Sequence, residues 1–256
     1  MPFEMFSAAH AAGLAASVIA VIVIIVFRKQ MRQPKLNRTV RYGLALLLIT
    51  CEISLQLSYL LEHNWGIGSM PFQLCSLMLV VSALLLVTNR NNLYDAVFFL
   101  GSMGALQAIL TPNLDETFPH FRYFHFFTAH IGIIGAAFFI TAVERYRPSF
   151  RSVLRAFVWL HVLAIPAAVV NIVSGTTNFM FLARKPGTAS LLDLLAPWPW
   201  YLLQLEVIAF AIFVLLYAVV RLLDHWFSRR RQIIELALKT KGSDYTIGGY
   251  TDERND

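Results

Sequence analysis

The amino-acid sequence predicts an all-α membrane protein, a bundle of seven transmembrane helices with its N-terminus outside and its C-terminus in the cytoplasm. The first indication is composition: 57% of the 256 residues are hydrophobic, 14% are charged, and the mean hydropathy is +0.61. The second is a series of apolar runs of about 20 residues, the length at which a helix crosses a bilayer. The third is the placement of Lys and Arg. We interpret the net charge of +6 as a sign of loops that face anionic lipid, and we expect no nucleic-acid partner.

Seven apolar runs are long enough to span. They cover residues 8–27, 42–61, 71–88, 94–111, 124–143, 154–174 and 200–222. Every Lys and Arg except Arg122, Arg184 and Lys185 falls in or beside the first, third or fifth connection, or from residue 221 onward. Cytoplasmic loops carry such an excess, which gives the predicted orientation and a multi-pass protein of the plasma membrane. The first ten residues contain no Lys or Arg, so we expect the first span to be retained and not cleaved as a signal peptide.

The predicted domain organisation has two parts. Residues 1–222 form one transmembrane domain. Residues 223–256 form a cytoplasmic segment that begins as a basic amphipathic stretch, RRRQIIELALKTKG. This stretch either lies along the inner headgroups or stays unstructured, and from Gly242 onward we expect disorder.

The stretch TPNLDETFPHFRYFHFFTAH, residues 111–130, has the highest density of chemically active groups in the chain. Long apolar runs flank it on both sides. Polar and charged residues at the edge of a bilayer are costly, which favours a functional site. The candidate residues are Asn113, Asp115, Glu116, His120, Arg122, His125 and His130.

A layer of polar side chains is predicted at one depth. At 1.5 Å of rise per residue, one such group on each of six spans falls about 5–10 Å below the outer helix end. These residues are Gln56, Cys75, Gln107, His130, Asn171 and Glu206. Since polar groups in a bundle face its interior or a wet cavity, we predict one pocket open to the outside. The alternatives are an interhelical hydrogen bond for each amide and a packing role for Cys75. Cys51 lies deeper, so we expect no disulfide with Cys75.

The connection from Asn178 to Trp200 contains apolar segments that are too short to span. They are NFMFLAR and SLLDLLAPWPW, the latter containing Asp193 and the interfacial aromatic residue Trp198. We predict that this connection covers the pocket as a lid, with a plain surface loop at the headgroups as the alternative.

Three motifs carry a resemblance to a known family. PFQLCSL, GALQAILTPNLDETFPHFRYFHFFTAH and NFMFLARKPGTASLLDLLAPWPWY resemble the YwaF family of bacterial integral membrane proteins, over residues 71–201. More distantly, the seven-span plan is similar to the eukaryotic transmembrane protein 164 acyltransferases. That family moves an acyl chain through a cysteine thioester, and a histidine is also implicated. The resemblance implies these two roles for Cys75 and His130.

Acyl transfer on lipid at the outer leaflet is therefore the predicted function. A thiolate is the nucleophile, and an imidazole that accepts its proton activates it. Amide side chains of the pocket can donate to a developing oxyanion; the candidates are Gln73, Gln107 and Asn171, with Gln56 and Glu206 completing the polar pocket. Arg122, Arg184 and Lys185 are expected to bind an anionic headgroup. The expected partners are membrane lipids, with no cofactor and no metal ion.

Two other readings stay open. One is a metal-dependent lipid hydrolase that uses His120, His125 and His130 with Asp115 or Glu116, although a spacing of five turns successive histidines about 140° apart on a helix. The other is a receptor or transporter for a small ligand or lipid, with no covalent chemistry. The last span has no Lys for a Schiff base, and no inverted repeat is present. Transfer and hydrolysis by the same nucleophile are not separated by the sequence.

Overall fold

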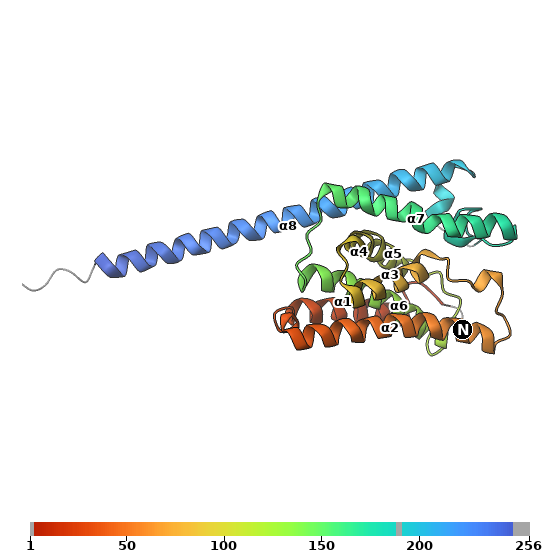
Figure 1. Ribbon diagram of the computed structural model, residues 1–256, viewed down its shortest axis with the longest axis horizontal. Coiled ribbons are helices and arrows are strands. Elements are labelled where there is room, and N and C mark those ends of the chain that lie inside the picture. Colours follow the sequence, from red (N-terminus) through yellow and green to blue (C-terminus); the bar gives the residue numbers. More distant parts are fainter. Residues whose placement is uncertain (1–2, 188–190, 248–256) are drawn as a thin grey trace, which may run out of the picture.

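The computed structural model describes residues 3–187 and 191–247, and this part of the chain is helical and contains no strand (Figure 1). The main helices are α1 (Ala8–Val26), α2 (Pro34–Leu61), α3 (Leu74–Thr88), α4 (Asn91–Ala96), α5 (Ser102–Leu110), α6 (Phe121–Ala142), α7 (Phe150–Ser174) and α8 (Trp200–Ile247). A π-helical stretch, η3 (Val97–Gly101), joins α4 to α5 without a break. Short 3₁₀ turns are η1 (Gln30–Arg32), η2 (Ile67–Ser69), η4 (Phe179–Phe181) and η5 (Leu191–Leu194).

Six of the described helices are long and apolar enough to cross a membrane. They are α1, α2, the continuous unit Asn91–Leu110, α6, α7 and the Trp200–Arg230 part of α8. The chain is therefore a multi-pass membrane protein. The predicted third span, 71–88, coincides with α3, which has 15 residues. At 1.5 Å per residue this helix is shorter than the hydrocarbon core of about 30 Å.

Local sequence explains where several helices begin and end. Pro34 occupies the first turn of α2, where its missing N–H costs nothing. The hydroxyl of Ser149 accepts the Ser152 N–H at 3.3 Å and caps α7. Asn89, with φ of 54°, ends α3, and Gly175, with φ of 66°, ends α7.

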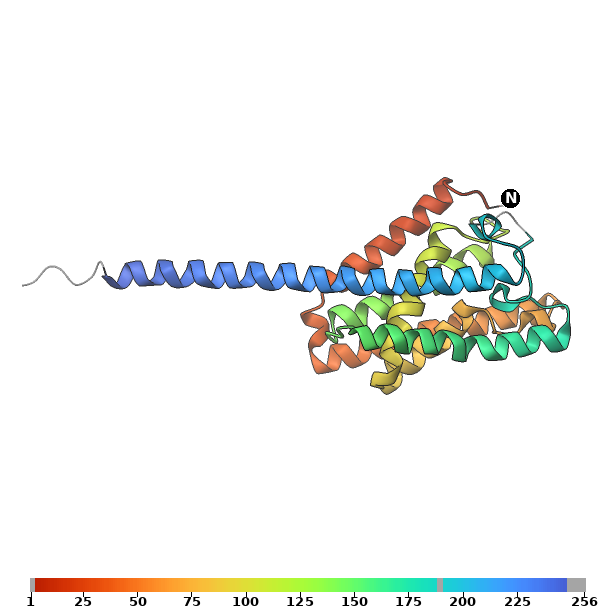
Figure 2. The same cartoon turned by 90° about the horizontal axis from the view of Figure 1, so that it is seen from above.

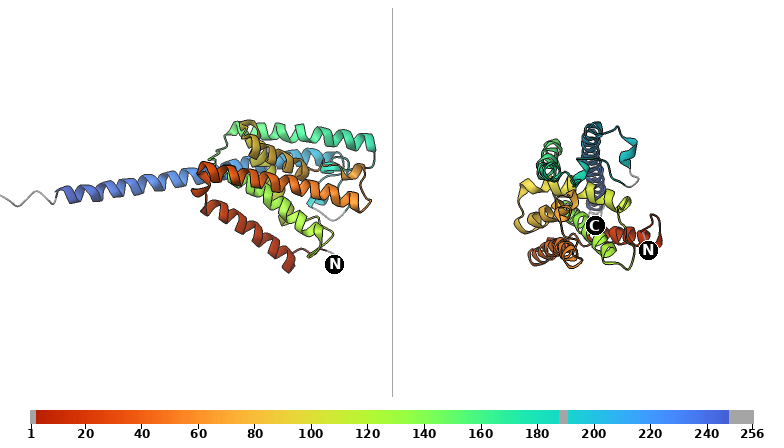
Figure 3. Two further views of the ribbon diagram at one scale, coloured as in Figure 1. Left: turned by 60° about the horizontal axis from the view of Figure 1, so that its bottom comes forward. Right: turned by 90° about the vertical axis from the view of Figure 1, so that its right-hand side faces the viewer.

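The core surrounds α6, which packs against α1, α2, α3, α5 and η3. Helix α1 lies against α6 (Figure 3). A glycine makes this approach possible, because a Cβ on Gly13 would lie 2.2 Å from Cε1 of Phe127. Small residues allow close helix contact in membranes, and Gly13 is such a case.

Helices α7 and α8 form an outer layer on this core (Figures 1 and 2). A stripe of aromatic rings attaches α8: Phe210 packs on Phe157 at 5.5 Å between ring centroids, and Phe213 packs on Phe99 at 5.4 Å. Beyond the bundle α8 continues as one long helix (Figure 2). It is helical to Ile247, whereas the sequence predicted disorder from Gly242; residues 248–256 lie outside the described part of the chain.

Arginine side chains form hydrogen bonds at the end of the bundle where α1 ends and α2 begins. This end is here called the basic end. Arg32 donates to the carbonyls of Ala142 and Val143 at 2.7 and 3.1 Å and so caps α6. The buried carboxylate of Asp95 accepts hydrogen bonds from Arg155 and Tyr146. Its two oxygens both have partners, so we interpret this group as structural.

Candidate functional site

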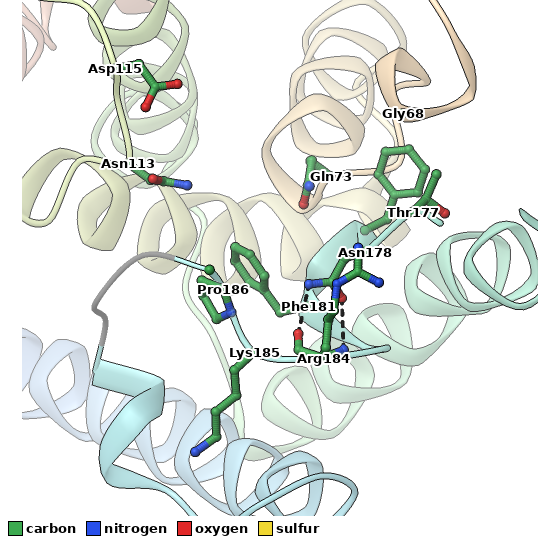
Figure 4. A pocket seen from close by; sticks show the side chains of 12 residues that line it. Gly68, Gln73, Asn113, Asp115, Thr177, Asn178, Phe181, Arg184, Lys185 and Pro186 are labelled. Atoms are coloured by element: carbon green, nitrogen blue, oxygen red, sulfur yellow. Dashed lines mark hydrogen bonds between the residues drawn. The ribbon is translucent and has the colours of Figure 1, made fainter. Parts of the chain in front are cut away.

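A cavity of about 540 Å³ opens at the other end of the bundle, here called the pocket end. It is lined by the connections α2–α3, α5–α6 and α7–α8, whose side chains are drawn in Figure 4. Its lining includes six of the predicted site residues: Gln73, Asn113, Asp115, Asn178, Arg184 and Lys185. The segment Asn178–Gly187 forms one wall, in the region predicted to act as a lid.

Charges of opposite sign line this cavity. Asp115 and Asn113 lie on one side of it, and Arg184 lies on the other (Figure 4). Arg184 donates to the Thr176 carbonyl at 2.8 Å and remains exposed. Lys185 extends toward α8, and its Nζ donates to the carbonyl of Leu195, in the connection that precedes this helix, at 2.7 Å. Arg184 is therefore the more available cation of the two.

Asn178 and Gln73 use their amides to shape the wall of the cavity. Oδ1 of Asn178 accepts the N–H groups of Ala183 and Arg184 at 3.2 and 3.0 Å, and its Nδ2 donates to the Arg184 carbonyl at 2.8 Å. Oε1 of Gln73 accepts the Met180 N–H at 3.0 Å. These bonds fix the loop backbone against the start of α3.

The predicted polar layer does not form one pocket. None of its six members lines the 540 Å³ cavity. Buried Asn171 accepts the N–H of Phe179 at 2.8 Å and donates to its carbonyl at 3.0 Å, so it anchors η4. Gln107 is exposed. Glu206 contacts His161, with 3.1 Å between Oε1 and Nε2. The prediction assumed that all outer helix ends share one level, but Glu206, near the start of α8, is level with His161, halfway along α7.

His130 is buried on α6, with 7% of its surface exposed. Its Nδ1 lies 2.7 Å from the Phe126 carbonyl. A carbonyl can only accept, so the hydrogen-bond network assigns the ring proton to Nδ1. Nε2 then carries the lone pair, and this nitrogen is the one that can take a proton.

Cys75 lies in the first turn of α3 as a partly exposed free thiol. Gly101 sets its level relative to α6, because a Cβ there would lie 3.3 Å from Met78 and 3.2 Å from Ile133. Cys75 precedes Met78 by one turn, and His130 precedes Ile133 by one turn. Both helices run from the pocket end to the basic end, so the thiol and the imidazole share a level. No hydrogen bond joins them in the described part of the chain.

Glu52 was missed by the sequence analysis. It is buried in α2, 8% exposed, and its Oε1 accepts Nε2 of Gln56 at 2.9 Å. The same Nε2 donates to the Ser69 carbonyl at 3.0 Å, and Trp65 donates to Oε1 of Gln56 at 3.1 Å. Oε2 of Glu52 is buried and has no partner among the described residues. The signal was available: a carboxylate inside the apolar run 42–61.

The other predicted residues are dispersed. Arg122 lies over the Tyr59 ring, 5.8 Å from its centroid, and does not line the cavity. Nε2 of His125 donates to the Cys51 carbonyl at 3.0 Å. His120 and Asp193 are exposed. Trp198 donates to the Leu182 carbonyl at 3.3 Å.

The histidines do not gather into a metal centre. In residues 3–187 and 191–247, no three His, Cys, Asp or Glu side chains are close enough to hold an ion. His10, which the sequence analysis did not single out, is buried with both ring nitrogens used, by the Ile109 carbonyl at 2.9 Å and by the Phe6 N–H at 3.0 Å. We interpret it as a structural bridge between α1 and α5.

Fold and site together define a multi-pass helical membrane protein with a charged cavity at one end, and with a partly exposed cysteine, a buried histidine and a buried glutamate near that end. The model of the TMEM164 family matches residues 5–217, and the chain belongs to this family. Searches of the curated proteins and of the solved structures gave no match. The more distant of the two resemblances in the sequence is thus the one that the family match supports, and the YwaF assignment stays a prediction.

Proposed function

We propose that this protein is a membrane acyltransferase that acts on lipid, with Cys75 as the nucleophile and His130 as its general base. The observation that carries the proposal is the free Nε2 of His130 at the level of the Cys75 thiol, one helical turn from the contacts at Gly101. A base whose proton-accepting nitrogen is uncommitted, beside a free thiol, is the arrangement that activates a thiol nucleophile. Membership of the TMEM164 family supports the same chemistry.

The proposed reaction has two half-reactions. In the first, sulfur of Cys75 attacks the ester carbonyl of a donor lipid while the thiol proton passes to Nε2 of His130. The ester C–O bond breaks, a thioester forms, and the departing alcohol takes the proton from His130. In the second, an acceptor hydroxyl attacks the thioester and gives its proton to His130, which returns it to the released thiolate. Water in place of the acceptor makes the same sequence a hydrolysis.

The cavity at the pocket end is the proposed headgroup site. Arg184 offers a guanidinium that matches two phosphate oxygens, and Lys185 adds a second positive charge. Arg122 takes no part in this proposal, since it lies over Tyr59 and outside the cavity lining. The cavity and the Cys75–His130 level both belong to the pocket end, so a lipid headgroup bound there brings its ester bonds toward the thiol.

We also propose the topology in which these steps occur. Helix α3, extended by the residues that precede it, is a further span, which brings the number of spans to seven. The pocket end faces outside, because all Lys and Arg except Arg122, Arg184 and Lys185 fall on the cytoplasmic side in that orientation. The membrane is the plasma membrane.

The test uses purified protein in phosphatidylcholine vesicles that carry a labelled acyl chain, with lysophospholipid as the acceptor. We expect labelled transfer product and a hydroxylamine-sensitive label on the protein. Cys75→Ala should lose both signals. Cys51→Ala, which removes the only other cysteine, is the matched control and should keep both. Undiminished transfer by Cys75→Ala protein would rule out the thioester.

A further inference from the structure

The carboxyl group of Glu52 is the most conspicuous unexplained polar group of the described chain. One of its oxygens has a partner in Gln56, and the other, Oε2, is buried without one. Buried polar atoms are nearly always hydrogen-bonded, and the exceptions call for an explanation such as a catalytic role or a bound group. A carboxylate in an apolar interior is costly unless a positive charge lies near it.

The register of α2 against α3 gives the level of Glu52. At the basic end, Arg41 of α2 donates to the carbonyls of Leu86 and Val87 of α3 at 2.7 and 3.3 Å. The two helices are antiparallel, and Glu52 and Cys75 are equally many residues away from the Arg41–Leu86 contact. With the same rise per residue on both helices, the two side chains lie at one level.

The face of α2 that carries Glu52 also meets α6. Leu48, one turn away on that face, would contact a Cβ on Gly132 of α6 at 2.9 Å. Gln56, one turn away in the other direction, bonds to Ser69 just before α3. Glu52 therefore faces the two helices that carry Cys75 and His130.

We infer that Glu52 is the third ionisable group of this site, a positioning residue that stabilises the protonated imidazole of His130. The inference rests on the proposed function for its role in a reaction. When the thiol proton passes to Nε2, a positive charge appears in an apolar layer. A carboxylate at the same level lowers the free energy of that state, and Oε2 gains the positive neighbour that it lacks.

Other charged or titratable groups also face this part of α2. On α6, Arg122 lies over Tyr59, and His125 donates to the Cys51 carbonyl. Cys51 is itself buried on α2, and Cys75 is the group of α3 at this level. Nδ1 of His125 and Nε2 of His130 are both proton-accepting nitrogens without a hydrogen-bond partner in the described part of the chain. Of these two rings, His130 is the one at the level of Cys75, because His125 lies more than one turn nearer the pocket end of α6.

The test is a titration of the ring of His130 by NMR in the full-length protein, with ¹³C-labelled histidine. The signal is assigned by its loss in His130→Gln. We expect Glu52→Gln to move the half-protonation point of His130 down by about one pH unit, because a nearby opposite charge favours the charged form by at least this amount. The amide keeps an acceptor for Gln56. Glu62→Gln, at the exposed end of the same helix, is the control and should leave the point unchanged.

An unchanged half-protonation point in Glu52→Gln overturns the inference. If this variant does not fold, the reciprocal titration decides: the carboxyl signal of Glu52 should titrate at higher pH in His130→Gln than in the parent protein, and no change again overturns it. Neither reading depends on acyl transfer. If these titrations shift and Cys75→Ala keeps full transfer, the inference about Glu52 stands and the thioester is rejected. If the titrations do not shift and Cys75→Ala loses transfer, the thioester stands and the inference about Glu52 is rejected.

Discussion

The imidazole of His161 and the carboxylate of Glu206 meet between α7 and α8, with 3.1 Å between Nε2 and Oε1. Nδ1 of the same ring lies 2.8 Å from the Phe157 carbonyl, an acceptor, so it donates. One proton then lies between His161 and Glu206, on either partner. The contact joins α8 to the rest of the bundle. Few other residues of the Trp200–Arg230 part of α8 are buried.

We expect this pair to stabilise the docking of α8 by about 0.6 kcal/mol, with an upper value of about 1.7, as for hydrogen bonds between membrane helices. Both side chains are about half exposed, which limits the value. A double-mutant cycle with His161→Gln and Glu206→Gln, read by unfolding free energy, measures the coupling. Additive effects of the two substitutions would mean that the contact contributes nothing.

Cys75 and His130 should behave as one unit. We expect Cys75→Ser to lose most of the transfer activity, because a hydroxyl is far less acidic than a thiol and His130 would have to remove its proton outright. His130→Ala should lose a similar factor, of about 10³ or more, and the double variant little beyond that. Initial transfer rates in vesicles check this. Losses that multiply in the double variant would show that the two residues act independently.

Arg184 should affect lipid binding and not the chemical step. Replacement by Lys removes the paired donors of the guanidinium but keeps the charge, so we expect an apparent KM about tenfold higher with kcat retained. Arg122→Lys is the matched control, because that side chain is outside the cavity. If the two substitutions raise KM equally, the headgroup does not bind in the cavity.

Gly13 should be intolerant of even one added methyl group. The Cβ of alanine would lie 2.2 Å from the Phe127 ring, so we expect Gly13→Ala to destabilise the fold by about 1–3 kcal/mol, the usual range for overpacking. At Gly43 of α2 no atom lies within 4 Å of an added Cβ, and Gly43→Ala should stabilise by up to about 1 kcal/mol. Thermal unfolding of both variants in one detergent gives the comparison. A Gly13→Ala protein as stable as the parent would show that α1 is free to move.

The orientation is testable in intact cells with an impermeant thiol reagent. In a background without Cys51 and Cys75, His120→Cys at the pocket end should be labelled. Pro148→Cys, in the connection between α6 and α7, should not. The reverse pattern would invert the proposed topology.

The helices were predictable because spanning length and apolar composition are local properties of the sequence. Each of the seven predicted runs coincides with a helix, and six of the helices meet the length and composition of a span. The polar layer was less predictable, since the depth of Glu206 depends on where α8 begins, and this depends on how the α7–α8 connection folds. Arg122 and Arg184 also could not be separated, because only packing shows that one lies over Tyr59 and the other in the cavity.

Glu52 illustrates the opposite case, because its residue type alone was a signal. A carboxylate in an apolar run is rare enough to name in advance. Its partner Gln56 was expected to face a pocket, but the structure shows it bonded to Glu52, Trp65 and Ser69. Local sequence could not reveal the bonds to Trp65 and Ser69, since they join the helix to a loop that follows it, whereas the bond to Glu52 lies within α2.

The π-helical stretch η3 adds one residue to a turn in the middle of the apolar unit Asn91–Leu110. Each residue of an α-helix turns the chain by about 100°, so this extra residue sets the rotation of everything that follows it up to Leu110. Gly101 ends the stretch and faces both Met78 and Ile133. A deletion of one residue there would restore a regular helix and rotate α5 against its neighbours, so that the glycine would no longer face both α3 and α6. Gly101 thus contacts both the helix that carries the thiol and the helix that carries the imidazole, from a third helix that carries neither group.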